Sequence, residues 1–248
     1  LIIVQLVAFQ VIISQRQKEH TLAANSVDLS TLDEQAFLGK GEADQLLDLK
    51  DIISTNGSAD TWQFLVKVYK TELQSAARAH DLAHYVGGLI FDEYNFEGLT
   101  ICTLEFAFGC YHGFFDNAFR SSLEKLATAE AGCLKVGPVG SGPNASCIHG
   151  IGHGVATFYK LEDLQAALSA CDRLKNGSEY CYDGVFMEFE RSAPDTYYIV
   201  QDPLFPCDSV DTKFSHSCGR NQTTVMMQRL GLDFPKVVSV CLNNTNES

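Results

Sequence analysis

Five of the seven histidines in this chain lie in three short segments whose spacing suits metal binding. Two segments have the form His-x-x-x-His, and i,i+4 spacing places both imidazoles on one face of a helix, about one turn apart. Two side chains placed in this way can bind a single ion, because imidazole is a common ligand of zinc, copper and iron. The five residues are His80, His84, His112, His149 and His153.

The cysteines indicate that these segments belong to a repeat. Four segments align on a cysteine followed two residues later by His, His, Asp or Arg, and these cysteines lie 37, 34 and 37 residues apart: Cys110, Cys147, Cys181 and Cys218. Each is preceded by another cysteine 8 to 14 residues earlier. A period near 35 residues is typical of two-helix repeats, in which each hairpin buries its apolar face by stacking on its neighbours. We therefore predict an all-α fold of disulfide-linked helical hairpins stacked as a short solenoid.

This alignment brings the possible metal ligands into one column. His112, His149 and Asp183 occupy the same position of successive repeats, and Asp116 and His153 stand four residues after that position. Packed helices lie about 8–10 Å apart, so side chains from two neighbouring helices can meet at an ion between them. Glycines beside the column indicate close approach of the helix backbones. The predicted ligand set is His80, His84, His112, His149, His153, Asp116 and Asp183.

The donor types narrow the choice of metal. With the thiols oxidised, the ligands are imidazoles with one or two carboxylates, which suit Zn, Fe or Cu and disfavour an iron–sulfur cluster. The chain has no C-x-x-C-H motif for covalent haem. The candidates outnumber the ligands of one tetrahedral ion, so both a dinuclear site and one ion with outer partners remain open.

Disulfides are the interpretation of the cysteines that the repeat favours. The chain has nine cysteines and no C-x-x-C pair. Pairing across each hairpin loop closes loops whose stabilisation is on the order of 3 kcal/mol each in the chain-entropy model. The predicted pairs are Cys102–Cys110, Cys133–Cys147, Cys171–Cys181 and Cys207–Cys218, which leaves Cys241 over.

Disulfides and glycosylation sequons together predict an extracytoplasmic protein, at the cell surface, in a periplasm-like space or secreted. Six asparagines open an Asn-x-Ser/Thr sequon and are predicted to be glycosylated: Asn56, Asn144, Asn176, Asn221, Asn243 and Asn246. Residues 1–15 begin with an apolar run that is shorter than the roughly 20 residues of a full span, and we interpret them as a signal anchor or the end of a transmembrane segment. The net charge of −13, without a basic run, argues against nucleic acid as a partner.

The remaining sequence divides into a polar tether, residues 16–59, and a helical repeat domain, residues 60–248 with the histidine cluster. Apolar periodicity predicts one long helix from Trp62 to Phe91, with Ser58 or Asp60 as its N-cap. Over residues 98–240 the hairpin repeat resembles tetratricopeptide-like solenoids, which implies a fold class. The W-x-x-L-G…Y pattern of that family is absent, so the resemblance transfers no functional residue.

Three functions are consistent with these patterns. The first is a metalloenzyme with a redox or hydrolytic centre in the histidine column. The second is a non-catalytic metal-binding protein, or an accessory subunit of a membrane protein complex. The third is a solenoid scaffold for protein–protein contact, whose histidines are structural. An open ligand position favours the first, and a closed shell of protein ligands favours the second.

Overall fold

The computed structural model describes residues 27–70, 76–160, 162–192 and 204–244, and all the regular secondary structure in these residues is helical. The prediction of an all-α fold is therefore confirmed. The α-helices are α2 (Glu34–Leu38), α3 (Glu42–Tyr69), α4 (Ala76–Tyr94), α5 (Gly109–Phe119), α6 (Leu126–Val136), α7 (Gly142–Phe158), α8 (Leu164–Cys171), α9 (Ser178–Ser192), α10 (Ser215–Arg229) and α11 (Phe234–Asn244). Short 3-10 turns connect some of them, including η4 (Phe106–Phe108).

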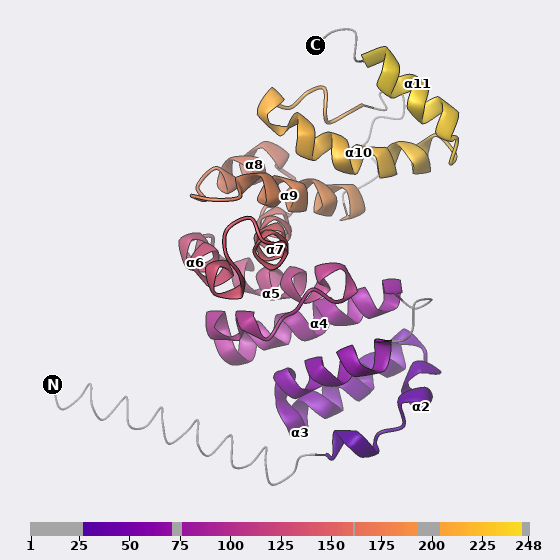
Figure 1. The fold of residues 1–248 in the computed structure, drawn as a ribbon, viewed down its shortest axis with the longest axis vertical. Coiled ribbons are helices and arrows are strands. Elements are labelled where there is room, and N and C mark those ends of the chain that lie inside the picture. Colours follow the sequence, from indigo (N-terminus) through magenta and orange to yellow (C-terminus); the bar gives the residue numbers. More distant parts are fainter. Residues whose placement is uncertain (1–26, 71–75, 161, 193–203, 245–248) are drawn as a thin grey trace, which may run out of the picture.

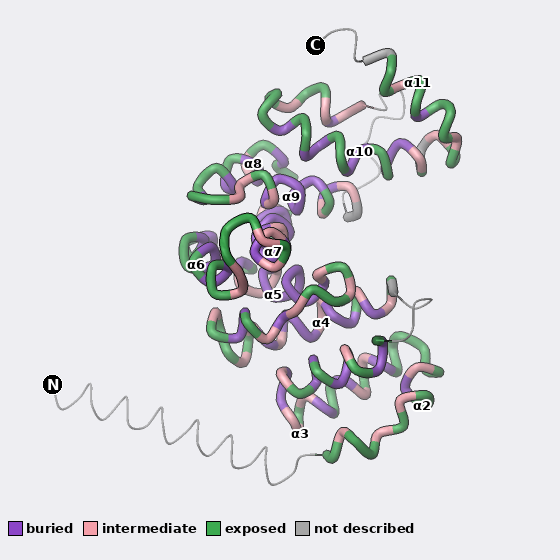
Figure 2. Tube along the Cα trace, in the orientation of Figure 1, coloured by how far each residue is buried: buried purple, intermediate pink, exposed green. Residues whose placement is uncertain are grey.

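The helices succeed one another along the long axis of the molecule, from α2 and α3 at one end to α10 and α11 at the other (Figure 1). Helix α4 packs on α5, α5 on α7, α7 on α9 and α9 on α10, while α6 and α8 cover α7 and α9. The three helices that carry the clustered histidines, α4, α5 and α7, are thus successive layers. Buried residues run through the middle of this stack, and exposed ones lie on the outer loops and at the two ends (Figure 2).

Four disulfides join the cysteine pairs expected from the repeat: Cys102–Cys110, Cys133–Cys147, Cys171–Cys181 and Cys207–Cys218. All of these cysteines except Cys207 are buried, whereas Cys241 is free and exposed. Such a set of disulfides indicates an oxidising, extracytoplasmic location. The predicted anchor at residues 1–15 lies outside the described residues. Among the described helices, none is long and apolar enough to cross a membrane.

The long helix expected from Trp62 to Phe91 is wrong, because α3 ends at Tyr69 and α4 begins at Ala76. The two helices pack against each other, and each buries an apolar face, so the same periodicity continues on both sides of the break. The start of the expected helix is nearly right, because α3 joins two helical segments across a kink at Gly57 (φ 83°), and the second segment begins beside Ser58, one of the two expected N-caps.

Part of the predicted tether belongs to the helical body. Helices α2 and α3 occupy residues for which the polar composition predicts a linker, and Phe37, Leu49 and Ile52 enter the hydrophobic core. A few apolar residues at helical spacing are enough to pack these segments on the rest of the stack.

Two of the six sequons lie in unsuitable places for a glycan. The Asn144 amide is buried and donates to the carbonyl oxygen of Cys133, and the Asn221 amide is buried between Asp183 and Ser217. In the folded protein these two side-chain amides contribute to helix packing, and glycosylation at these positions stays a prediction. Asn176 is exposed, and Asn246 lies outside the described residues.

Candidate metal centre

Glycines bring the backbones of the histidine-bearing helices unusually close together. A Cβ atom placed on Gly113 of α5 would lie 1.8 Å from the carbonyl oxygen of His84 in α4. One placed on Gly154 of α7 would lie 2.4 Å from the carbonyl oxygen of Phe115 in α5. No side chain fits at either position, so glycine is required for these contacts. Short distances between the helices allow imidazoles from all three of them to meet.

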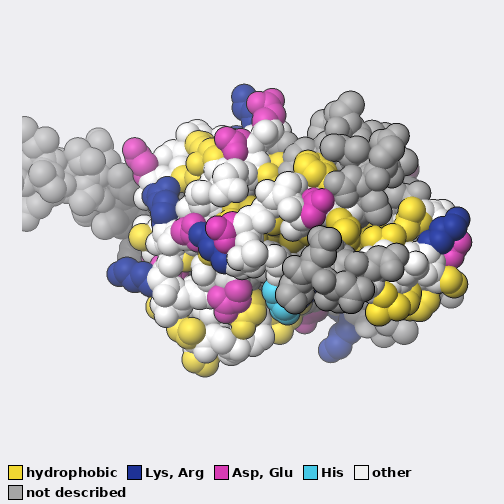
Figure 3. Space-filling model, turned by 90° about the horizontal axis from the view of Figure 1, so that it is seen from above, with side chains coloured by type: hydrophobic (Ala, Val, Ile, Leu, Met, Phe, Trp, Pro, Cys, Tyr) yellow, Lys and Arg dark blue, Asp and Glu magenta, His cyan; other side chains and the backbone are white. Residues whose placement is uncertain are grey.

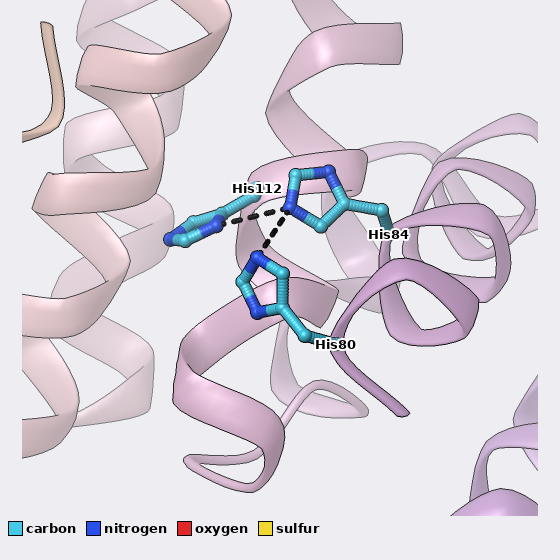
Figure 4. A group of neighbouring side chains, drawn as sticks. All are labelled: His80, His84 and His112. Atoms are coloured by element: carbon cyan, nitrogen blue, oxygen red, sulfur yellow. Dashed lines mark hydrogen bonds between the residues drawn. The ribbon is translucent and has the colours of Figure 1, made fainter. Parts of the chain in front are cut away.

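The first cluster joins α4 and α5 (Figure 4). Nε2 of His84 lies 3.1 Å from Nε2 of His80, in keeping with their i,i+4 spacing, and 3.2 Å from Nδ1 of His112. His80 and His84 are partly exposed, whereas His112 is fully buried. Together, these three side chains offer nitrogen atoms that all lie within 4.8 Å of one another.

The second cluster joins α5 and α7 and shares His112 with the first. His112, His149 and His153 also offer nitrogen atoms within 4.8 Å of one another. Nε2 of His149 lies 3.1 Å from Nε2 of His153, and the ring of His153 stacks on that of His112 at 3.7 Å between centroids. The structure therefore brings together all five histidines that the sequence singles out, in two overlapping triads.

Hydrogen bonds from outside the cluster determine where two ring protons lie, those of His80 and His153. Nδ1 of His80 is 2.7 Å from the carbonyl oxygen of Phe106, which can only accept, so the His80 proton is on Nδ1 and its Nε2 presents a lone pair. Nδ1 of His153 donates to a carboxylate oxygen of Glu188 at 2.8 Å, so its Nε2 presents a lone pair as well. Nδ1 of His84 lies 3.6 Å from a carboxylate oxygen of Asp116.

These assignments leave the first cluster without a complete set of hydrogen bonds. A neutral ring nitrogen carries either a proton or a lone pair. Nε2 of His84 therefore cannot donate to His80 and also accept from His112. In the second cluster, Nε2 of the buried His112 has no hydrogen-bond partner. Unpaired buried nitrogens are costly, and a cation placed among the lone pairs would satisfy them.

The surroundings favour the neutral form of two imidazoles, those of His112 and His149. Burial is the main cause that lowers the pKa of His112 and of His149 well below the ordinary range, and repulsion from His153 adds to the effect. A neutral imidazole is the form that binds a metal, since the proton of an imidazolium must leave before a metal–nitrogen bond can form.

A left-handed turn holds one edge of the site. Phe106, Ala107 and Phe108 of η4 all have positive φ angles, of 56°, 48° and 67°, a conformation that is costly for residues with side chains. The ring of Phe106 packs against Trp62, which helps to keep the turn in place. The turn directs its first carbonyl at His80 and lies within the loop closed by the Cys102–Cys110 disulfide.

The two predicted carboxylates lie outside the triads. Asp116 is beside His84 and accepts a hydrogen bond from Thr157 at 2.9 Å, a position that suits orientation of the ring. Asp183 is buried between α9 and α10, where Arg220 binds it. Its column position is therefore occupied by an ion pair.

Glu188 contacts His153 and the carbonyl group of Phe106 contacts His80, and the residue patterns in the sequence predict neither contact. Glu188 lies one residue after Met187, the position that aligns with His153, so the repeat register alone does not place its carboxylate at the site. Nothing in the sequence signals the backbone carbonyl, because any residue type offers one.

The fold and the site define an all-α protein with four disulfides and two overlapping, largely buried histidine triads. Comparison of the chain with protein-family models, with curated proteins and with solved structures finds no match. The function of the chain is therefore inferred from the geometry of the triads.

Proposed function

We propose that this protein binds transition-metal ions outside the cytoplasm through its five clustered histidines. The single observation that carries the proposal is the contact of Nε2 of His84 with both Nε2 of His80 and Nδ1 of His112, at 3.1 and 3.2 Å. Two nitrogens bound at about 2.0–2.1 Å to one tetrahedral ion lie roughly 3.3 Å apart. Nε2 of His84 is thus already spaced from each of the other two nitrogens like a ligand of one shared ion, and it cannot donate to His80 and also accept from His112.

The donor set favours Zn, Cu or Fe. The triads consist of imidazoles alone, and the carboxylates of Asp116 and Glu188 contact the outer nitrogens of His84 and His153. Carboxylate–histidine pairs of this kind commonly orient metal ligands and raise their basicity. We further propose that Asp116 acts in this way, while Asp183 supports the fold through Arg220.

We favour a metalloenzyme-type centre, redox or hydrolytic, because the first triad reaches the surface. The side chains of His84 and Asp116 are 18% and 28% exposed. Three imidazoles leave a fourth position of a tetrahedral ion for water or a small substrate, which is the usual form of a catalytic site. A non-catalytic metal-binding protein is the second candidate, and the complete burial of His112 and His153 favours it. It could serve as an accessory subunit of a membrane complex.

The helix order and the N-terminal sequence also support a proposal for the fold around this centre and for its location. We propose that the layers from α4 to α10 form a short solenoid of disulfide-linked hairpins. The apolar residues 1–15 would attach it to a membrane, with the helical body on the extracytoplasmic side. The exposed sequon at Asn176 could carry a glycan there.

Metal content tests the proposal directly. Elemental analysis of the protein purified from its native source should find bound Zn, Cu or Fe. The variants His84→Ala and His149→Ala should each lose bound metal and keep their helicity and disulfides. The exposed His216 in α10 lies outside the triads, so His216→Ala is the matched control and should lose none. Absence of metal from the native protein, together with no uptake of Zn or Cu by the purified chain, would leave the scaffold function.

A further inference from the structure

The five histidines do not contribute equally, because one of them belongs to both triads. His112 lies on α5, which packs on α4 on one side and on α7 on the other. Its Nδ1 faces His84, and its other ring nitrogen points away from His80 and His84 (Figure 4). The ring is thus placed between two sets of ligands.

The nitrogen on the far side is an unpaired polar atom in the interior. The His112 side chain is 0% exposed, and its Nε2 has no hydrogen-bond partner. A buried polar atom without a partner destabilises the folded state, so a ligand at this nitrogen would stabilise it. On the α7 side, the ring of His112 has the rings of His149 and His153 as neighbours, at 5.3 and 3.7 Å between centroids.

For two of the other rings, a hydrogen bond already occupies one nitrogen, and a carboxylate lies beside one nitrogen of a third ring. Nδ1 of His80 donates to a carbonyl oxygen and Nδ1 of His153 to a carboxylate, while Nδ1 of His84 lies beside Asp116. Each of these rings has only Nε2 left to offer to an ion. His112 differs from them, since Nδ1 meets the first cluster and Nε2 has no partner.

We propose that His112 bridges two metal ions as an imidazolate. Nδ1 would bind the ion held by His80 and His84, and Nε2 would bind the ion held by His149 and His153. The proposal rests on the metal-binding function proposed above. Bonds of about 2.0–2.1 Å on either side of the ring would place the two ions about 6 Å apart.

The protons and charges of such a bridge balance. Neutral His112 carries one ring proton, and this proton leaves to solvent when the second ion forms its bond to nitrogen. The resulting imidazolate has one negative charge, which it shares between the two cations. Asp116 and Glu188 add a carboxylate near each end of the cluster. The rings of His112 and His153 are stacked with an interplanar angle of 16°, so an ion shared by both would tilt one ring out of the stack.

Copper loading of the full chain tests the bridge. Metal-free protein is given two equivalents of Cu(II) and desalted, and total copper is compared with the copper visible by electron paramagnetic resonance at low temperature. An imidazolate couples two Cu(II) spins antiferromagnetically, so we expect two copper ions per chain and most of the signal missing. His112→Ala should bind less copper, and all of it should be visible.

His80→Ala keeps His112 in place and is the second variant, in case His112→Ala does not fold. It removes one ligand of the first triad, and we expect one copper ion per chain with a full signal. His216→Ala should behave like the unmodified protein, and circular dichroism checks the helicity of each variant.

The other outcomes distinguish failure of the His112 bridge from failure of the metal-binding function on which it rests. One copper ion per chain, or two with the full signal, would overturn the bridge and keep the metal site. Coupling that persists in a folded His112→Ala variant would assign the bridge to a solvent-derived oxygen and overturn the role of His112. Absence of bound copper and zinc would overturn the metal-binding function itself.

Discussion

Nδ1 of His153 in α7 lies 2.8 Å from Oε2 of Glu188 in α9, which joins one layer of the helical stack to the next. The imidazole is completely buried, and the carboxylate is 13% exposed. This pairing leaves Nε2 of His153 with a lone pair that faces His149. Because α9 contributes none of the clustered histidines, Glu188 acts on the site from outside the triads.

Glu188→Gln should weaken metal binding without abolishing it. A glutamine still accepts a hydrogen bond from His153, but it lacks the negative charge that makes the imidazole a stronger ligand, and such changes typically cost 10–100-fold in affinity. Competition with a chromophoric zinc chelator measures the dissociation constant. Glu190→Gln, two residues along the same helix, is the matched control. Equal affinities for the two variants would contradict the role assigned to Glu188.

The sequence predicts the helical class, the disulfide pairs and the convergence of His112, His149 and His153 because all three follow from one periodic pattern. His80 and His84 lie before the first repeated cysteine, and only their i,i+4 spacing indicates that they belong to the site. If the helices form a stack of similar hairpins, as proposed above, cysteines and histidines at repeated sequence positions lie at repeated places in that stack. The break between α3 and α4 could not be predicted in this way, because both helices bury apolar faces and the periodicity does not change at the turn.

Contacts that would change if the register shifted by one residue also cannot be predicted from the periodic pattern. The repeat alignment places Asp183 in the column, yet Arg220 from α10 occupies its carboxylate, and neighbouring Glu188 reaches His153 instead. Which of two acidic residues on one helix faces the site is decided by the rotation of that helix. Period alone does not determine this rotation.

Substitution of Gly113 by alanine should disrupt both the fold and the site. The added Cβ would lie 1.8 Å from the backbone oxygen of His84, so α4 and α5 would have to move apart. We expect a loss of about 1–3 kcal/mol or more in the free energy of unfolding, as for other overpacked positions, and weaker metal binding. Urea titrations followed by circular dichroism measure the first effect.

The control for this variant is Gly219→Ala, also in a helix. A Cβ there would meet nothing within 4 Å, so alanine should stabilise α10 by about 0.5–1 kcal/mol. If Gly113→Ala proved as stable as Gly219→Ala, the close backbone contact would not be present in solution.

Removal of the Cys133–Cys147 disulfide should lower stability and loosen the second triad. Cys147 precedes His149 by two residues in α7, and its bond fixes this helix to α6. The double substitution of both cysteines by serine should cost about 2–5 kcal/mol in the free energy of unfolding. Thermal unfolding measured without reductant checks this. Cys241→Ser, which removes the exposed free thiol, should leave the melting temperature unchanged.

Stability should also depend on pH through Glu190. Burial raises the pKa of this carboxyl to about 7, from an ordinary value of 4.5, and the side chain lies beside Phe186 and Phe189. Between these two pH values the folded protein holds the proton more tightly than the unfolded chain does. The contribution of the protonated Glu190 carboxyl to stability is therefore fully present below pH 4.5 and is lost as the pH rises through about 7.

Glu190→Gln removes this dependence, because glutamine stays neutral at every pH. We expect the variant to be more stable than the unmodified protein at pH 8, by about 1 kcal/mol after allowance for the partial exposure of Glu190, and nearly equal to it at pH 4. Chemical unfolding at the two pH values measures the difference, with the exposed Glu124→Gln as control. A Glu190→Gln variant that gains no stability between pH 4 and pH 8 relative to the unmodified protein would show that this carboxyl ionises in the folded state as readily as in water.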